Sequence, residues 1–230
     1  MKPRFLLAFL PAFAAASLPG AVVVAYVAEA TDGALAGQSS DPRLTGATVT
    51  RGADLAPVDD FAGYFDSSNW SQSSVFPGVE SGSRLSFSFE VDPGYLWVPD
   101  SLRIAYQDAG SADSARRLDL RHSGDGFQSS LFLDTSISAF PGPNDVNFID
   151  LSNLEPLSGT VEFRLYGYGA LSAAGVLGLA NDPALDIDGT PHALVITGDL
   201  VVIPEPRLWA LLPVLLAVGV FLCRRALSGK

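Results

Sequence analysis

The chain has 230 residues, of which 48% are hydrophobic and 17% charged, and its formal net charge at pH 7 is −11. This length is enough for one domain with a sizeable core. Between residues 22 and 203 eight arginines stand against 24 aspartates and glutamates, so the interior carries a net charge of −16. Such a charge repels a phosphate backbone and argues against nucleic-acid binding.

The first predicted element is an N-terminal secretory signal peptide over residues 1–21. Lys2 and Arg4 precede an apolar stretch over 5–16, and small residues follow it, which is the three-part layout of such signals. The cleavage position stays open. An uncleaved anchor is the alternative, but the stretch is shorter than the roughly 20 residues that a spanning helix needs. We therefore expect export through the secretion machinery.

The interior over 22–202 is predicted to be one all-β domain. Short apolar runs alternate with Gly, Pro, Asp, Asn and Ser, and no long stretch has a helical period. The clearest strand is 83–92, where four apolar side chains alternate with polar ones before an Asp-Pro-Gly turn. Further strands are expected over 22–27, 47–51, 102–107, 116–121, 127–133, 160–168 and 193–202. Their spacing favours an antiparallel two-sheet sandwich, jelly-roll-like, over a barrel.

Three segments of the interior are predicted to lie outside the strands. The Ser-rich segment 66–74 and the Pro-Gly-Pro at 141–143 are expected to be long surface loops. Residues 171–191 are expected to form a Gly- and Asp-containing excursion before the last strand. The interior contains no cysteine, because the chain's single one is Cys223, so its stability must come from packing.

Five aromatic residues in the first half of the domain could form a platform for stacking sugars. They are Tyr64, Phe65, Trp70, Tyr95 and Trp97. Aromatic faces offer large contact areas to sugar rings, so Trp70 and Trp97 are candidate carbohydrate contacts, with exopolysaccharide as the partner. Core packing and loop anchoring are the commoner fate of such side chains. A carbohydrate-binding module is therefore our second functional hypothesis.

The interior carries little that predicts catalysis. It has no lysine, which excludes a P-loop and a Schiff-base enzyme, and it has no G-x-S-x-G nucleophile elbow. His122 and His192 are its only imidazoles, and neither lies in a zinc-type spacing. We predict a protein that is not an enzyme and needs no cofactor. A secreted hydrolase is the third hypothesis, and it requires a pocket that gathers a histidine with carboxylates.

A weak calcium candidate lies near the end of the domain at Asp182, Asp186 and Asp188. Closely spaced carboxylates supply the hard oxygens that calcium prefers. Alignment with an EF-hand, however, leaves Ala184 at the first ligand position and Val195 at the twelfth, where a bidentate Glu belongs. A solvated acidic turn is the favoured interpretation, and we predict no metal site.

The C-terminal segment over 203–230 contains a Pro-Glu-Pro tripeptide, Pro204, Glu205 and Pro206, before an uncharged run of 16 residues over 208–223. The prolines keep the tripeptide extended and accessible. The run reaches about 24 Å as a helix, somewhat less than a bilayer core of about 30 Å, and predicts a modest transmembrane anchor.

Arg224 and Arg225 close this apolar run and orient it. By the positive-inside rule they stay in the cytoplasm, which places the acidic interior on the far side of the membrane. The signal peptide and the tail therefore agree on the topology.

Residues 202–230 resemble the PEP-CTERM signal, in which a Pro-Glu-Pro tripeptide, a transmembrane segment and a basic cluster are read by a membrane protease called exosortase. Segments 159–170 and 121–127 resemble parts of exported PEP-CTERM proteins whose body is a β-sandwich. The resemblance implies sorting through Pro204 to Pro206 by an exosortase-like protease; a plain tail anchor is the alternative. Our leading hypothesis is an exported, surface-sorted, non-enzymatic protein of the cell envelope or the extracellular matrix.

Overall fold

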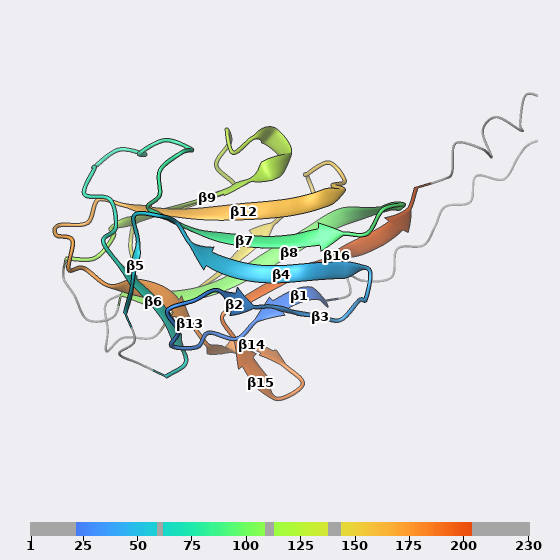
Figure 1. Ribbon diagram of the computed structural model, residues 1–230, viewed down its shortest axis with the longest axis horizontal. Helices are drawn as coiled ribbons and strands as arrows, with labels where there is room; N and C mark the ends of the chain where they lie inside the picture. Colours follow the sequence, from blue (N-terminus) through green and yellow to red (C-terminus); the bar gives the residue numbers. More distant parts are fainter. Residues whose placement is uncertain (1–21, 59–61, 109–112, 138–143, 204–230) are drawn as a thin grey trace, which may run out of the picture.

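The computed structural model describes residues 22–58, 62–108, 113–137 and 144–203. These residues form two antiparallel β-sheets that pack face to face, together with a two-stranded ribbon (Figure 1). The described part of the chain contains no α-helix, and its single helical turn is the 3-10 turn η1 (Ser123–Asp125). The prediction of an all-β sandwich is confirmed.

The larger sheet has eight strands in the order β3-β1-β16-β8-β13-β6-β5, and β11 pairs with β8 in addition. Its strands are β1 (Val22–Tyr26), β3 (Gln38–Ser39), β5 (Ala56–Val58), β6 (Tyr64–Ser68), β8 (Tyr95–Asp108), β11 (Asp145–Asp150), β13 (Leu177–Ala180) and β16 (Leu194–Val202). The long strand β8 is its centre: β16 and β13 follow each other along one edge of β8, and β11 lies along the other edge.

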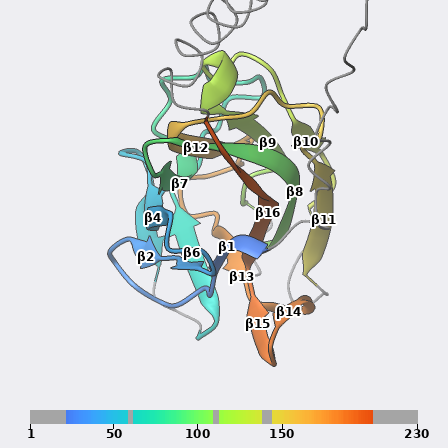
Figure 2. The ribbon, with the colours of Figure 1, turned by 90° about the vertical axis from the view of Figure 1, so that its right-hand side faces the viewer.

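The smaller sheet has six strands in the order β10-β9-β12-β7-β4-β2. Its strands are β2 (Leu35–Ala36), β4 (Leu44–Arg51), β7 (Arg84–Val91), β9 (Arg117–His122), β10 (Phe132–Asp134) and β12 (Gly159–Tyr168). The remaining strands, β14 (Asp182–Ile187) and β15 (Thr190–His192), form the ribbon. Because β7 and β9 belong to one sheet and β8 to the other, the chain crosses between the sheets repeatedly (Figure 2).

The main core fills the space between the two sheets. The predicted alternation in β7 is confirmed, since its four apolar side chains are at most 1% exposed. Phe87 on β7 lies opposite Phe163 on β12, and such cross-strand aromatic pairs stabilise a sheet. The Trp97 ring of β8 meets Phe89 and Phe163 edge-on at centroid distances of 5.2 and 6.2 Å.

A small second core lies on the outer face of the larger sheet. Ala25, Ala105 and Val195 come from β1, β8 and β16, and Leu185 and the partly buried Ile187 cover them from the ribbon. The ribbon therefore packs against a face that an isolated sandwich would expose to water. This cover explains why both faces of β8 are buried near its end.

Three expectations for the loops and strands were wrong or incomplete. Segment 66–74 begins inside β6, and Asp66 is buried there, so it is not a surface loop throughout. The excursion over 171–191 contains β13, β14 and most of β15. The expected strand over 127–133 is interrupted because Gly126 and Phe127 both have positive φ, which leaves only β10. The Pro-Gly-Pro at 141–143 lies outside the described residues.

The first and last strands of the domain are antiparallel neighbours. Val22 at the start of β1 lies opposite Thr197, and Tyr26 at its end lies opposite Leu194. Moving toward the beginning of β1 therefore means moving toward the end of β16. Both ends of the domain lie on the same side of the sandwich, to the right in Figure 1.

Candidate functional site

The two tryptophans that were predicted as carbohydrate contacts belong to the core, and this prediction is wrong. Trp70 is 1% exposed and Trp97 is fully buried. The Trp70 indole Nε1 donates a hydrogen bond of 2.7 Å to the Ser67 carbonyl. A sugar cannot stack on a ring whose faces are covered by protein.

A glycine in the smaller sheet explains how Trp70 reaches the interior. The ring lies against Gly167 of β12, where an added Cβ would come within 2.2 Å of Trp70 Cε3. Gly167 therefore leaves the space that the indole fills, because any side chain at this position would occupy it. Gly167, which stands between two tyrosines inside this strand, was the one sequence signal for this contact.

The three aspartates of the calcium candidate lie at opposite ends of the ribbon. Asp182 pairs with His192 at its base, whereas Asp186 and Asp188 lie beside the turn. The Asp186 carboxylate accepts a hydrogen bond of 2.8 Å from the Gly189 backbone N–H, and that of Asp182 accepts one from the Ala184 N–H. The described residues contain no group of three metal-ligating side chains. These carboxylates stabilise turns in the backbone.

His122 lines a hollow of about 240 Å³ together with the carboxylates of Asp125 and Glu155. Its Nδ1 accepts a hydrogen bond of 3.2 Å from the Gly124 N–H, and its Nε2 lies 3.8 Å from Asp125 Oδ1. Burial acts to raise the pKa of Asp125, but hydrogen bonds from Ser129 and the nearby imidazole hold it below its usual value. The described lining contains no Ser, Thr, Cys or Lys, so this hollow offers a hydrolase no hydroxyl, thiol or amine nucleophile.

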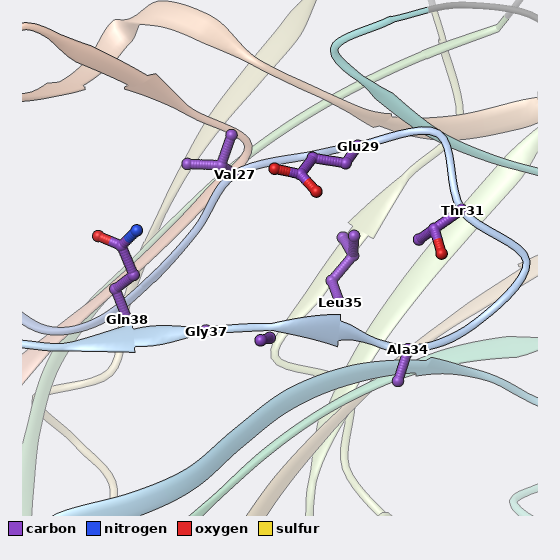
Figure 3. A pocket seen from close by; sticks show the side chains of 8 residues that line it. Val27, Glu29, Thr31, Ala34, Leu35, Gly37 and Gln38 are labelled. Atoms are coloured by element: carbon purple, nitrogen blue, oxygen red, sulfur yellow. The ribbon is translucent and has the colours of Figure 1, made fainter.

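A larger hollow of about 430 Å³ lies between residues 27–31 and the segment that contains β2 and β3. Figure 3 shows the side chains of Glu29, Leu35 and Gln38 extending into the space between these two segments. Leu35 is buried and forms an apolar floor, while Glu29 and Gln38 are exposed. The hollow thus combines an apolar base with polar walls.

A second hollow of about 270 Å³ adjoins the first and shares Gln38 with it. It lies between β1 and β3 on one side and the ribbon on the other, and Ile187 and Ala25 form its apolar part. Its described polar lining consists of Gln38, Ser39, Ser40, Asp188, Thr190 and His192. We call the two hollows together the β3 groove.

Hydrogen bonds fix the wall of the β3 groove that residues 27–31 form. Asn181 bonds Ala28 twice, since its Oδ1 accepts from the Ala28 N–H at 2.7 Å and its Nδ2 donates to the Ala28 carbonyl at 2.9 Å. The Arg51 guanidinium donates to the Thr31 carbonyl at 2.8 Å and stacks 3.6 Å from the centre of the Phe65 ring. These contacts hold the wall in place without a ligand. The wall therefore loses less conformational entropy when a ligand binds.

Acidic and neutral polar groups line the β3 groove. Glu29 and Asp188 contribute carboxylates, and no described lining residue is an arginine or lysine. His192 is 3% exposed, and its Nδ1 has no hydrogen-bond partner among the described residues. The sequence had singled out Asp188 and His192, but nothing in it pointed to Glu29 or Gln38, because only the fold brings these segments together.

The predicted sorting and targeting elements lie outside the described residues. They are the signal peptide 1–21, the motif Pro204, Glu205 and Pro206, the apolar run 208–223, and Arg224 and Arg225. Within the ranges that the structure describes, no helix has the length and hydrophobicity to cross a membrane.

Comparison with known proteins adds little to this geometry. No protein-family model matches the chain, and no curated protein matches it. Among solved structures, the chain is similar to the N-terminal cellulose-binding domain of β-1,4-glucanase C from Cellulomonas fimi, with 14% identity and a TM-score of 0.33. The match covers 73% of this chain and 99% of that one. A similarity this low leaves the function to be argued from the chain itself.

Proposed function

We propose that this chain is an exported, surface-sorted protein without catalytic activity, which becomes part of the cell envelope or the extracellular matrix. Its sandwich, with a jelly-roll-like path between the sheets, is the exported body. An exosortase-like membrane protease reads Pro204, Glu205 and Pro206, and the segment over 208–223 anchors the chain in the membrane before processing. Arg224 and Arg225 keep the end of the chain in the cytoplasm.

The observation that carries this proposal is the position of the two ends of the domain. β1 and β16 are antiparallel neighbours, so the predicted signal peptide and the predicted sorting tail both join the sandwich on one side. During export the chain is attached to the membrane first through the signal peptide and then through the tail, and this arrangement lets the same side of the sandwich face the membrane in both stages.

The boundary at the end of β16 also suits processing at the tripeptide. The Ile203 N–H donates a hydrogen bond of 2.7 Å to the Gly94 carbonyl, directly before Pro204. Val201 and Val202 are 46% and 62% exposed, so the strand has already left the core at this point. A cut between residues 204 and 206 would therefore remove the tail without taking core residues from the sandwich.

Cell fractionation with intact-mass analysis tests the proposal. We expect the wild-type chain in the envelope or extracellular fraction, with masses that show loss of the signal peptide and a cut near the tripeptide. Glu205→Ala should leave the tail in place and retain the protein in the membrane. Glu80→Ala, which changes an exposed glutamate of the sandwich, serves as the control. Full-length, soluble protein in the cytosol would overturn the proposal.

A carbohydrate-binding surface module is the second candidate function, and the β3 groove favours it. Hydroxyl, amide and carboxylate side chains line the groove over an apolar floor, which suits sugar hydroxyls better than an apolar ligand. This site replaces the two buried tryptophans as the place of contact. Binding on a glycan array that weakens in a Gln38→Ala variant is the expected result, and an array without binding would remove this candidate.

A further inference from the structure

The charge of the β3 groove restricts the sugars that it can accept. Glu29 contributes a carboxylate to the first hollow and Asp188 one to the second, and no arginine or lysine in the described lining balances them. The whole interior is acidic as well. Glycans that carry uronate or sulfate groups would meet like charges here, and such contacts weaken binding.

The lack of an aromatic side chain in the described lining argues against a neutral glycan. Phe, Tyr and Trp supply the large stacking areas on which uncharged sugar rings depend, and no such residue lines either hollow. Affinity must then come from hydrogen bonds, and those to ionised groups are about twice as strong as neutral ones. A ligand with ammonium groups would form such bonds with Glu29 and Asp188.

A buried imidazole gives independent support for a ligand in the second hollow. His192 is more than nine-tenths buried, lines the hollow, and leaves Nδ1 without a hydrogen-bond partner among the described residues. More than about 90% of buried polar atoms in proteins have a partner, so a ring nitrogen without one beside a hollow is a candidate for a hydrogen bond to a ligand once the ring turns toward it. Hydroxyl and amino groups of a sugar can act as either.

We infer that the β3 groove binds a glycan whose sugar units carry free amino groups. The inference rests on the carbohydrate-binding candidate and adds the class of sugar to it. Glu29 and Asp188 form charge-assisted hydrogen bonds with the ammonium groups. Gln38, which lines both hollows, and Thr190 accept and donate hydrogen bonds with the hydroxyls, while Leu35 and Ile187 contact the carbon face of the sugar rings.

Calorimetric titration of the purified full-length chain tests the inference with four probes of matched length. They are a β-1,4-linked glucosamine hexamer, cellohexaose, a galacturonate hexamer and hexalysine. We expect the glucosamine hexamer to bind most tightly and its affinity to fall with added salt. Glu29→Gln and Asp188→Asn should each weaken it about tenfold or more, since each removes one charge-assisted bond. Asn suits the positive φ of residue 188, so this variant should fold.

Asp32→Asn is the matched control, because Asp32 is an exposed carboxylate near the groove that does not line it. It should leave the affinity unchanged. Equal weakening by Asp32→Asn, or no weakening by the two groove variants, would overturn the site. Tighter binding of cellohexaose or of the galacturonate hexamer would overturn the sugar class while carbohydrate binding stands. If hexalysine binds as tightly as the glucosamine hexamer, the groove is assigned to a basic peptide instead. If none of the four probes produces heat of binding, the proposed glycan site is wrong.

Discussion

The two buried tryptophans differ in one atom's environment, and the same substitution should therefore affect them differently. Trp70 Nε1 donates to the Ser67 carbonyl at 2.7 Å, whereas Trp97 Nε1 is buried without a partner among the described residues. Both rings are at most 1% exposed. Replacing each by Phe removes a similar volume from the core, so the lost transfer energy and the cavity contribute similarly at the two sites.

The two variants should differ in stability because only Trp70 makes a hydrogen bond through its indole N–H. Trp70→Phe leaves the carbonyl of the buried Ser67 without this donor, and an unsatisfied buried polar group costs about 1–3 kcal/mol. Trp97→Phe instead removes an N–H that already lacks a partner, which offsets part of the cavity cost by a similar amount. The two effects add, so we expect Trp70→Phe to lower the free energy of unfolding by about 2–6 kcal/mol more than Trp97→Phe does.

Urea unfolding followed by far-UV circular dichroism measures this difference, because the signal does not depend on tryptophan fluorescence. The slope of the free energy against urea should be the same in both variants, so that a change in midpoint reports stability. Equal destabilisation by the two substitutions would refute the reasoning, as would a larger loss for Trp97→Phe. Either result would mean that the indole N–H of Trp97 is satisfied in the folded protein.

Three further predictions concern a glycine, a carboxylate and an arginine. Gly167→Ala places a Cβ 2.2 Å from the Trp70 ring and should lower the midpoint of thermal unfolding, with a cost of about 1–3 kcal/mol. Because the folded state lowers the pKa of Asp125, the stability it contributes is complete above its unfolded-state pKa of about 4 and is lost as the pH falls through the folded-state pKa. Asp125→Asn should therefore flatten the decline in stability below about pH 4, as urea titrations at several pH values would measure. Arg51→Lys keeps the charge but loses the planar guanidinium that donates a hydrogen bond to the Thr31 carbonyl. The segment next to Thr31 is then held less firmly, so endoproteinase Asp-N should cut at Asp32 several times faster.

Controls separate these effects from general loss of fold. Gly33→Ala meets no atom closer than 3.7 Å and should leave the thermal midpoint nearly unchanged. Asp186→Asn changes a turn carboxylate elsewhere, and a flattened pH profile in this variant too would remove the assignment to Asp125. Equal rates of proteolysis in the wild type and Arg51→Lys would show that the wall is held by Asn181 alone.

The strands in which apolar side chains alternate with polar ones could be predicted from the sequence, and strands without a clear alternation could not. In β7, Leu85 and Phe87 alternate with Ser86 and Ser88 because the outer face stays in contact with water. In the second half of β8, Leu102, Ile104 and Tyr106 alternate with Ser101, Arg103 and Gln107, and this half was predicted. The first half, which contains Pro99, was not. The strands β13 and β15 were missed because they are short, and β14 was missed because it begins with Asp182-Pro183, a pair typical of turns.

The candidate site could be predicted only in part. Asp188 stood out as part of a weak calcium candidate and His192 as one of two histidines in the interior, but a solvated acidic turn and a structural role were the favoured interpretations. Glu29 and Gln38 are ordinary polar residues in a segment without a motif. Asn181, which precedes the weak calcium candidate, fixes a wall of the groove through its side-chain amide.

The sequence by itself determined the all-β class and the acidic, lysine-free interior, because composition and short-range period are properties of the chain alone. Tertiary structure decided which side chains are covered. Core packing was the commoner expectation for Trp70 and Trp97 and a sugar platform the other, and the outcome depended on Gly167 and Phe163 in a strand many residues away. Whether a side chain is buried depends on which residues pack against it, and the fold determines which residues those are.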